Sequence, residues 1–247
     1  MSNLIIDVGN TSTAMKFGSQ VYHIDGLFED AAKVALEAFP KAAAVHYVSV
    51  VPARDVEWAA LCAKHGKPLK VVSSDKLQVT NDENCPFRLK YNYPHPETIG
   101  ADRLCDAEAA YHKYGAPVIV MDFGTALTAA VITKDDVWQG GVIAPGFPLM
   151  RDYLFERTAK LPRMEMPTTC PKIGKTTIEA MQFGALVGYR GMVREIVTEL
   201  SANYPDQNFK LVATGGFAPT VLSSLELPFV IDPELTLDGC DLICSRM

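Results

Sequence analysis

The sequence predicts an α/β protein built from two similar halves, each with the element order βββαβαβ. An apolar strand runs into an acidic, glycine-containing turn at Asp7-Val8-Gly9-Asn10-Thr11, and another follows at Asp122-Phe123-Gly124-Thr125-Ala126. Strands then alternate with helices, which favours parallel pairing, while the opening hairpins add an antiparallel edge. Because one long internal repeat indicates two similar domains, we expect one domain over 1–115 and another over 116–247.

Local signals predict the elements of the first half. Apolar runs indicate strands, and longer periodic segments that stop at Pro40 or Gly66 indicate helices. The expected strands are 4–6, 14–17, 21–24, 44–51 and 69–73, and the expected helices are 28–39, 56–64 and 100–114. Residues 75–99 form a loop rich in proline and aromatic residues, and such an irregular loop inside a compact protein is more often functional than not.

The second half repeats this order. The expected strands are 117–122, 127–133, 136–143, 209–213 and 229–231, the expected helices are 149–159, 176–204 and one after 219, and a tail ends the chain. Residues 162–173 are expected to form a linker in which prolines recur. Thr176 and Glu179 have the spacing of a capping box. Gly184 and Gly188 share a helix face, which would admit another helix, either of this chain or of a second subunit.

Composition excludes several classes of partner. The 247 residues carry a net charge of −6 without a basic run, which argues against nucleic acid and anionic membranes as main partners. No segment approaches the ~20 apolar residues of a membrane span. The N-terminus lacks a basic flank and a signal-like apolar core, so we expect a cytoplasmic location.

Cysteine and histidine spacing does not indicate a zinc site. The six cysteines and five histidines are scattered, without a CxxC or HxxxH pair. Cys240 and Cys244 have no second ligand pair nearby, so neither structural zinc nor a disulfide framework is expected. Most of the cysteines are expected to be small core residues.

The acidic turn allows two interpretations. Backbone N–H groups of a glycine-containing turn can converge on an anion, and hydroxyl groups add further donors. A carboxylate would repel phosphate unless a cation lies between them, so Asp7 suggests a divalent ion held directly or through water. The alternative is an ordinary tight hairpin with Asp and Asn as turn formers. The repeat favours the first, with two facing hairpins gripping a nucleoside triphosphate, and it aligns Asp7, Gly9, Thr13 and Ala14 with Asp122, Gly124, Thr128 and Ala129 without a gap.

Five motifs, in this order and across nearly the whole chain, resemble those of the type III pantothenate kinase family. That family lies within the sugar kinase, Hsp70 and actin superfamily, so the resemblance implies two ribonuclease H-like, actin-like domains with a central nucleotide cleft. The Gly-Ala-Asp-Arg element after Tyr-x-x-Pro is the most specific. The motifs are Asp7-Val8-Gly9-Asn10-Thr11, Tyr93-x-x-Pro96-x-x-x-Gly100-Ala101-Asp102-Arg103, Asp122-Phe123-Gly124-Thr125-Ala126, Gly140-Gly141-x-Ile143-x-Pro145-Gly146 and Thr214-Gly215-Gly216.

The resemblance implies ATP-dependent phosphorylation of the primary hydroxyl of pantothenate to 4′-phosphopantothenate, the first step of coenzyme A biosynthesis. It also implies Mg²⁺ or another divalent cation, K⁺ or NH₄⁺, and a homodimer whose dimerisation helix lies in the second domain. The residues after Ala126, Leu127-Thr128-Ala129-Ala130, depart from the family, which usually shows a further threonine and an acidic residue there. This departure weakens the inference of a second acidic contact at this turn.

Site residues carried over from the family fall into four groups. Asp102 is expected to be the catalytic base. The monovalent cation is expected at Asp122 and the divalent one at Asp7. The expected ATP contacts are Asp7, Val8, Gly9, Asn10, Thr11, Ser12, Thr13, Ala14 and Thr125. The expected pantothenate contacts are Tyr93, Gly100, Ala101, Asp102, Arg103 and, from across the dimer, Thr177.

Residue chemistry alone leaves simpler roles open for the helix start. Asp102 could be a plain N-cap, and the helix dipole is expected to lower its pKa. Arg103 could bind the pantothenate carboxylate with its planar fork, or form an ion pair with Asp106 or Glu108.

Two further positions allow two readings each. Tyr93 could hold pantothenate or pack on Pro94 or Pro96. Gly215-Gly216 could be a simple turn or the place where adenine lies against backbone.

Two alternative functions also fit the motifs. One is a kinase of the same superfamily that acts on another small acceptor. The other is a non-catalytic nucleotide-binding protein that acts as a transcriptional accessory factor, as some members of the family were first described. The joint presence of Asp102, Tyr93 and Arg103 favours catalysis, because nucleotide binding alone does not require them.

Overall fold

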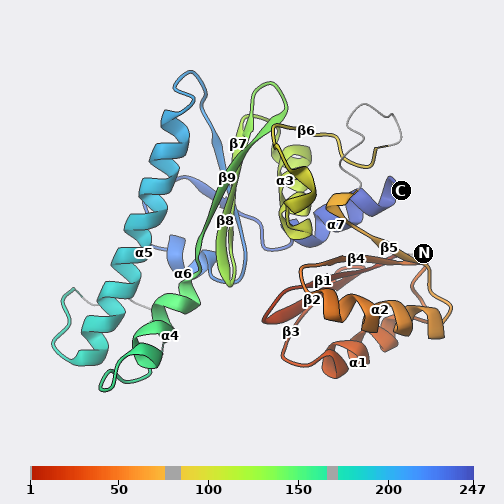
Figure 1. Ribbon diagram of the computed structural model, residues 1–247, viewed down its shortest axis with the longest axis horizontal. Helices are drawn as coiled ribbons and strands as arrows, with labels where there is room; N and C mark the ends of the chain where they lie inside the picture. Colours follow the sequence, from red (N-terminus) through yellow and green to blue (C-terminus); the bar gives the residue numbers. More distant parts are fainter. Residues whose placement is uncertain (1, 76–84, 166–171) are drawn as a thin grey trace. The chain divides into compact units, whose positions relative to one another are not determined.

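The computed structural model describes residues 2–75, 85–165 and 172–247 and divides the chain into two compact units (Figure 1). The first unit contains Met1–Gly115, Asp136–Trp138 and Glu234–Met247, and the second contains Ala116–Asp135 and Gln139–Pro233. Among the described residues, none of the helices is both long and apolar enough to span a membrane.

The first unit is built on a sheet with the strand order β3-β2-β1-β4-β5. β1 pairs antiparallel with β2 and parallel with β4, so the opening hairpin forms the antiparallel edge that the sequence predicts. The elements of the first unit are β1 (Leu4–Val8), β2 (Ser12–Phe17), β3 (Gln20–Asp25), α1 (Phe28–Ala38), β4 (Val45–Ser49), α2 (Pro52–Lys64), β5 (Leu69–Val71), β6 (Lys90–Tyr91), η2 (Pro96–Thr98), α3 (Ala101–Tyr114) and α7 (Leu235–Ser245).

The two faces of this sheet are covered by different helices. Leu4, Ile6 and Val8 point into a core that includes Trp58 of α2 and Ala31 and Ala35 of α1. Because side chains alternate along a strand, Asp7 faces the opposite side. That side is covered by α7, which packs on β1 and β4 and also against α3. The acidic residue thus lies on the face covered by α3 and α7.

The second unit repeats the first. Its strands are ordered β9-β8-β7-β10-β11, the same arrangement as β3-β2-β1-β4-β5, and this confirms the predicted duplication. The small strand β6 pairs with Val137 and Trp138, the first residues of β9, which belong to the first unit. The remaining elements are β7 (Val118–Phe123), β8 (Ala126–Thr133), β9 (Val137–Pro145), α4 (Phe147–Arg157), α5 (Thr177–Ala202), β10 (Lys210–Thr214), α6 (Ala218–Leu222) and β11 (Phe229–Ile231).

The end of the chain is a helix, so the expected tail is wrong. α7 packs so tightly on α3 that a Cβ atom at Gly239 would overlap the backbone of Cys105. Burial of Leu235, Cys240 and Cys244 stabilises this packing. Residues 234–247, which the sequence places with the second domain, therefore belong to the first compact unit.

Other boundaries differ from the expectation in smaller ways. α2 begins at Pro52 rather than Val56, because proline suits the first turn of a helix. The capping box of α5 is confirmed, since Thr176 accepts from the backbone of Glu179, whose own side chain accepts from the backbone N–H of Thr176. Part of the expected linker, 166–171, lies outside the described residues.

The two hairpins differ by one residue, so their ungapped alignment is wrong beyond the turn. In the first hairpin Asp7 pairs with Ala14, and in the second Asp122 pairs with Thr128 rather than Ala129. Gly9 N–H donates to Ser12 O at 2.9 Å, whereas Gly124 N–H donates to Ala126 O at 3.1 Å. The second turn is therefore shorter, and Ala14 corresponds to Thr128.

Candidate active site

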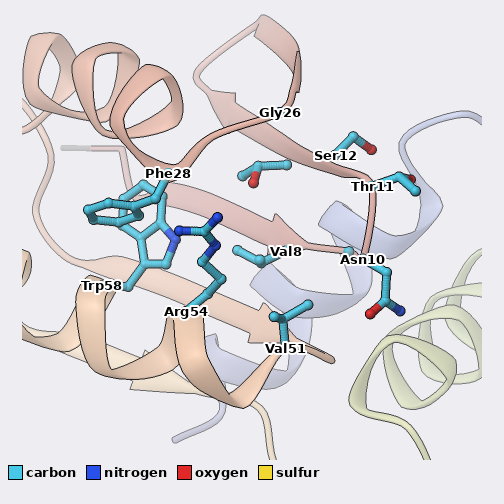
Figure 2. A pocket seen from close by; sticks show the side chains of 11 residues that line it. Val8, Asn10, Thr11, Ser12, Gly26, Phe28, Val51, Arg54 and Trp58 are labelled. Carbon is cyan, nitrogen blue, oxygen red and sulfur yellow. The ribbon is translucent and has the colours of Figure 1, made fainter.

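The first hairpin forms one wall of a pocket of about 130 Å³ in the first unit (Figure 2). The hydrogen bond from Gly9 to Ser12 closes the turn, so Asn10 and Thr11 project from its exposed tip. The pocket brings together most of the expected ATP contacts with residues that sequence reasoning missed. It is lined by Val8, Gly9, Asn10, Thr11, Ser12 and Thr13, and by Gly26, Phe28, Val51, Arg54 and Trp58.

Arg54 supplies a positive charge beside the hairpin. Its guanidinium lies 6.0 Å from the centre of the Phe28 ring and donates to Glu57 at 2.8 Å. Arg54 was not predicted because α2 was expected to begin after it, so no signal placed it near the turn. Asp7 and Ala14 do not line this pocket: they are cross-strand neighbours, and Asp7 faces the side covered by α3 and α7.

Asp102 lies in the first turn of α3, as the sequence predicts. Gly100 is the N-cap residue, so a plain N-cap role for Asp102 is wrong. The Asp102 carboxylate instead accepts from Arg103 N–H at 2.7 Å. Gly100 leaves room for it, since a Cβ atom there would lie 2.6 Å from Asp102 Oδ1.

Burial raises the pKa of Asp102 above its ordinary value of 3.8, although the N–H and the charge of Arg103 oppose the shift. The expectation that the helix dipole would lower this pKa is therefore wrong. Loss of hydration penalises the charged carboxylate more than the helix terminus stabilises it. A raised pKa makes Asp102 a stronger base than an exposed aspartate.

Tyr93, Arg103 and Trp138 form a cluster in the first unit. The Arg103 guanidinium lies 5.5 Å from the centre of the Trp138 ring, and its Nη2 donates to Tyr93 Oη at 3.4 Å. The Tyr93 ring packs edge-on against Trp138 at 5.4 Å between centroids. The structure thus brings together two of the predicted acceptor contacts and adds Trp138, a fully buried side chain that sequence reasoning missed.

The carboxylates proposed as alternative partners of Arg103 have other contacts. Asp106 accepts from Thr236 Oγ1 at 2.6 Å, and Glu108 accepts from Arg246 Nη1 at 2.9 Å. The Arg103 guanidinium also lies over the Trp138 ring, at 5.5 Å from its centre, an arrangement that suits the planar, delocalised charge of arginine.

The second hairpin gathers three predicted motifs in the second unit. Asp122 pairs with Thr214 across β7 and β10, which places Gly215 against the Asp122 carboxylate. Gly215 has φ +88° and a Cβ atom there would overlap that carboxylate, so only glycine fits. A Cβ atom at Gly146 would likewise overlap the carbonyl of Thr125.

The site residues divide between the units. The Asp7 turn, Tyr93 and Gly100–Arg103 lie in the first unit, whereas Asp122, Thr125 and Thr177 lie in the second. Thr177 is the exposed first residue of α5. Within the described ranges, no group of three or more His, Cys, Asp or Glu side chains could hold a metal ion, so any cation here needs oxygen ligands from elsewhere, such as water, backbone or phosphate.

Residues 3–199 match the family model for type III pantothenate kinase. The chain belongs to the type III pantothenate kinase family. A type III pantothenate kinase of Geobacillus kaustophilus is 36% identical over 260 residues, covering 98% of this chain and 96% of the relative. One of Akkermansia muciniphila is 46% identical over 158 residues, covering 63% of this chain and 65% of the relative.

Solved structures agree on the fold. A protein described as a Baf family transcriptional activator from Campylobacter jejuni has a TM-score of 0.64 at 16% identity, covering 98% of each chain. A ROK family glucokinase from Streptomyces griseus, in complex with glucose and AMPPNP, has a TM-score of 0.52 at 12% identity, covering all of each chain. These likenesses confirm the predicted fold for this member of the pantothenate kinase family.

Proposed function

We propose that this protein transfers the γ-phosphoryl group of ATP to the primary hydroxyl of pantothenate, giving 4′-phosphopantothenate in the first step of coenzyme A biosynthesis. The family match over residues 3–199 carries the proposal. The half-buried Asp102 supports it, because it lies at the start of the helix that also bears Arg103 of the aromatic cluster. A cytoplasmic location is part of the proposal.

A coupled assay of ADP release tests this function. Pantothenate should give ADP formation that requires Mg²⁺, and other small acceptors, such as sugars and hydroxy acids, should give little. ATP binding without turnover on any acceptor would contradict the proposal and favour a non-catalytic role.

Positioning and charge neutralisation account for most of the rate enhancement in phosphoryl transfer, because the transition state is loose. Asp102 orients the acceptor hydroxyl and takes its proton late in the transfer. The fork of Arg103, held against Trp138, binds the pantothenate carboxylate. Backbone N–H groups and hydroxyls of the Asp7 turn hold the ATP phosphates, and Thr125 is a further ATP contact in this proposal.

Two acidic residues suit the cations that the family implies. Asp7 faces away from the apolar core at the end of β1 and provides carboxylate oxygens for Mg²⁺ with water and phosphate completing the set. A divalent ion held there would neutralise charge on the phosphates. Asp122, in contact with the backbone of Gly215, provides oxygen ligands for K⁺ or NH₄⁺.

The Asp122→Asn variant should lose much of its activation by monovalent cations. The amide keeps the shape of the side chain beside Gly215 but removes the charge that attracts the ion. We expect the K⁺ concentration for half-maximal rate to rise by about tenfold, the equivalent of ~1.4 kcal/mol. Initial rates measured across a KCl series, at ionic strength held constant with a tetraalkylammonium salt, check this. An unchanged K⁺ response would remove the assignment.

We also propose a homodimer formed through α5 and α4. Gly184, Val187, Gly188 and Gly191 recur on one side of α5, and a Cβ atom at Gly184 or Gly191 would meet nothing within 4 Å. Such a stripe allows close approach of another helix. Gly188 faces Met150 of α4, whereas the space that the described residues leave open at Gly184 and Gly191 favours a second subunit there. The adjacent helix α4 adds exposed apolar side chains, Leu149, Tyr153 and Phe155.

The Val187→Asp variant should therefore be monomeric, because it places a charge on this apolar stripe. Val230→Asp is the matched control, since Val230 of β11 is 42% exposed and Val187 is 43% exposed. Sedimentation velocity at micromolar concentration should show a dimer for the wild type and control. A wild-type monomer would contradict the dimer and with it the role of Thr177 across the interface.

A further inference from the structure

A buried carboxylate outside the expected contacts holds the loop that carries Tyr93. Glu108 lies on α3 and is 1% exposed. Its Oε1 accepts from the backbone N–H groups of Arg88 at 2.7 Å and Leu89 at 2.9 Å. Its Oε2 accepts from Arg246 Nη1 at 2.9 Å. One side chain of α3 therefore anchors both the loop and the last turn of the chain.

Arg246 reinforces the same anchor. Its Nη1 also donates to the carbonyl of Pro86 at 3.0 Å, so the guanidinium bridges Glu108 and the loop. Phe87 and Leu89, which flank these contacts, are buried. The segment 86–91 is thus held by charge-assisted hydrogen bonds, which are about twice as strong as neutral ones.

The anchor connects to the aromatic cluster through Tyr91. Tyr91 Oη donates to Glu108 Oε1 at 3.4 Å, and the centroid of the Tyr91 ring lies 6.0 Å from that of Trp138. β6 also pairs Tyr91 with Trp138 in register. Since Tyr93 and Arg103 both contact Trp138, the position of segment 86–91 fixes the cluster proposed to bind the acceptor.

A buried charge of this kind is a costly way to gain stability. Loss of hydration commonly cancels the attraction within a buried ion pair, and apolar replacements are often as stable. Such a group does, however, enforce one geometry, because its partners must all be in place to satisfy it. The observations fit a group that orients a loop better than one that merely stabilises a core.

We infer that Glu108 and Arg246 are positioning residues that hold segment 86–91, and through it Tyr93 and Trp138, in the geometry that binds the acceptor. The inference rests on the proposed function for the identity of the acceptor. Neither residue touches the reacting atoms, so their loss should affect acceptor binding and leave the ATP hairpin, with Val8 and Gly9, unchanged.

Arg246→Met and Glu108→Gln test this in the full-length protein. Each should raise the KM for pantothenate by about 10- to 100-fold, as expected when a binding group is displaced by about 1 Å, with the KM for ATP unchanged. Arg246→Lys keeps the charge but not both contacts, and should restore part of the affinity. Arg246 is the C-cap residue of α7 and lies outside the helix interior. Its replacement therefore still tests the inference if Glu108→Gln fails to fold.

Lys113→Met is the matched control. Lys113 on α3 pairs with Asp238 on α7 at 2.5 Å, so it links the same two helices through a different ion pair. It should leave the KM for pantothenate unchanged. An equal rise in this control, or equal rises in both KM values for Arg246→Met, would overturn the positioning role.

Amide hydrogen exchange separates this inference from the proposed function, because it needs no substrate. In Arg246→Met, peptides covering 86–91 should exchange faster than in the wild type, and peptides of the hairpin 4–17 should not. Unchanged exchange over 86–91 would overturn the anchor. Wild-type protein without turnover on pantothenate would instead refute the proposed function.

Discussion

The Asp102→Asn variant is expected to lose about 10²- to 10⁴-fold in kcat, the usual contribution of a positioned general base. Its amide oxygen can still accept from Arg103 N–H, so the start of α3 should keep its structure. Asp106→Asn is the matched control, because Asp106 is a buried aspartate of the same helix whose bond to Thr236 an amide oxygen can also accept. It should retain most of the turnover.

The same variant should not be less stable than the wild type. The pKa of Asp102 is raised in the folded protein, so above its ordinary value of 3.8 the folded state binds more protons than the unfolded state. The free energy of unfolding therefore falls as pH rises through this window, and the loss persists at neutral pH. Asparagine removes that loss.

Urea unfolding of both proteins at neutral pH and near pH 4 measures this difference, and the gain from asparagine should be larger at neutral pH. In the wild type, kcat should fall on the acid side with an apparent pKa above 3.8, because the base must lose its proton before it acts. Near wild-type turnover by Asp102→Asn would refute the base assignment.

The Asp7→Asn variant is expected to show the second largest effect. Loss of a carboxylate that holds Mg²⁺ against the phosphates removes several kcal/mol of transition-state stabilisation, or about 10²- to 10³-fold in kcat. The Mg²⁺ concentration for half-maximal rate should also rise. Initial rates over a Mg²⁺ series at fixed ATP measure both quantities.

Asp25→Asn is the control for this experiment. Asp25 is an exposed carboxylate of the same sheet, paired in register with Ser12 of the hairpin. It should leave the Mg²⁺ response unchanged. An Asp7→Asn variant with normal Mg²⁺ dependence would show that the ion is held by phosphate and water alone.

Much of the fold follows from local sequence patterns. The run Leu4-Ile5-Ile6 before Asp7 predicts β1, and its repeat before Asp122 predicts β7, because a buried strand needs only a short apolar run and a turn. The alternation that follows predicts both sheets. Gly100 through Arg103 marks the start of α3 in the same way, since helix starts have local signals.

What the sequence by itself determined is therefore the duplicated sheet, the two acidic turns and the place of Asp102 on α3. Only the tertiary structure decided that α7 returns to pack on α3, that Trp138 lies under Arg103, and that Glu108 joins Arg246 to the loop. It also reversed the expected pKa shift of Asp102. These features depend on which distant residues exclude water from a side chain, and burial of this kind leaves no periodic signal in the neighbouring sequence.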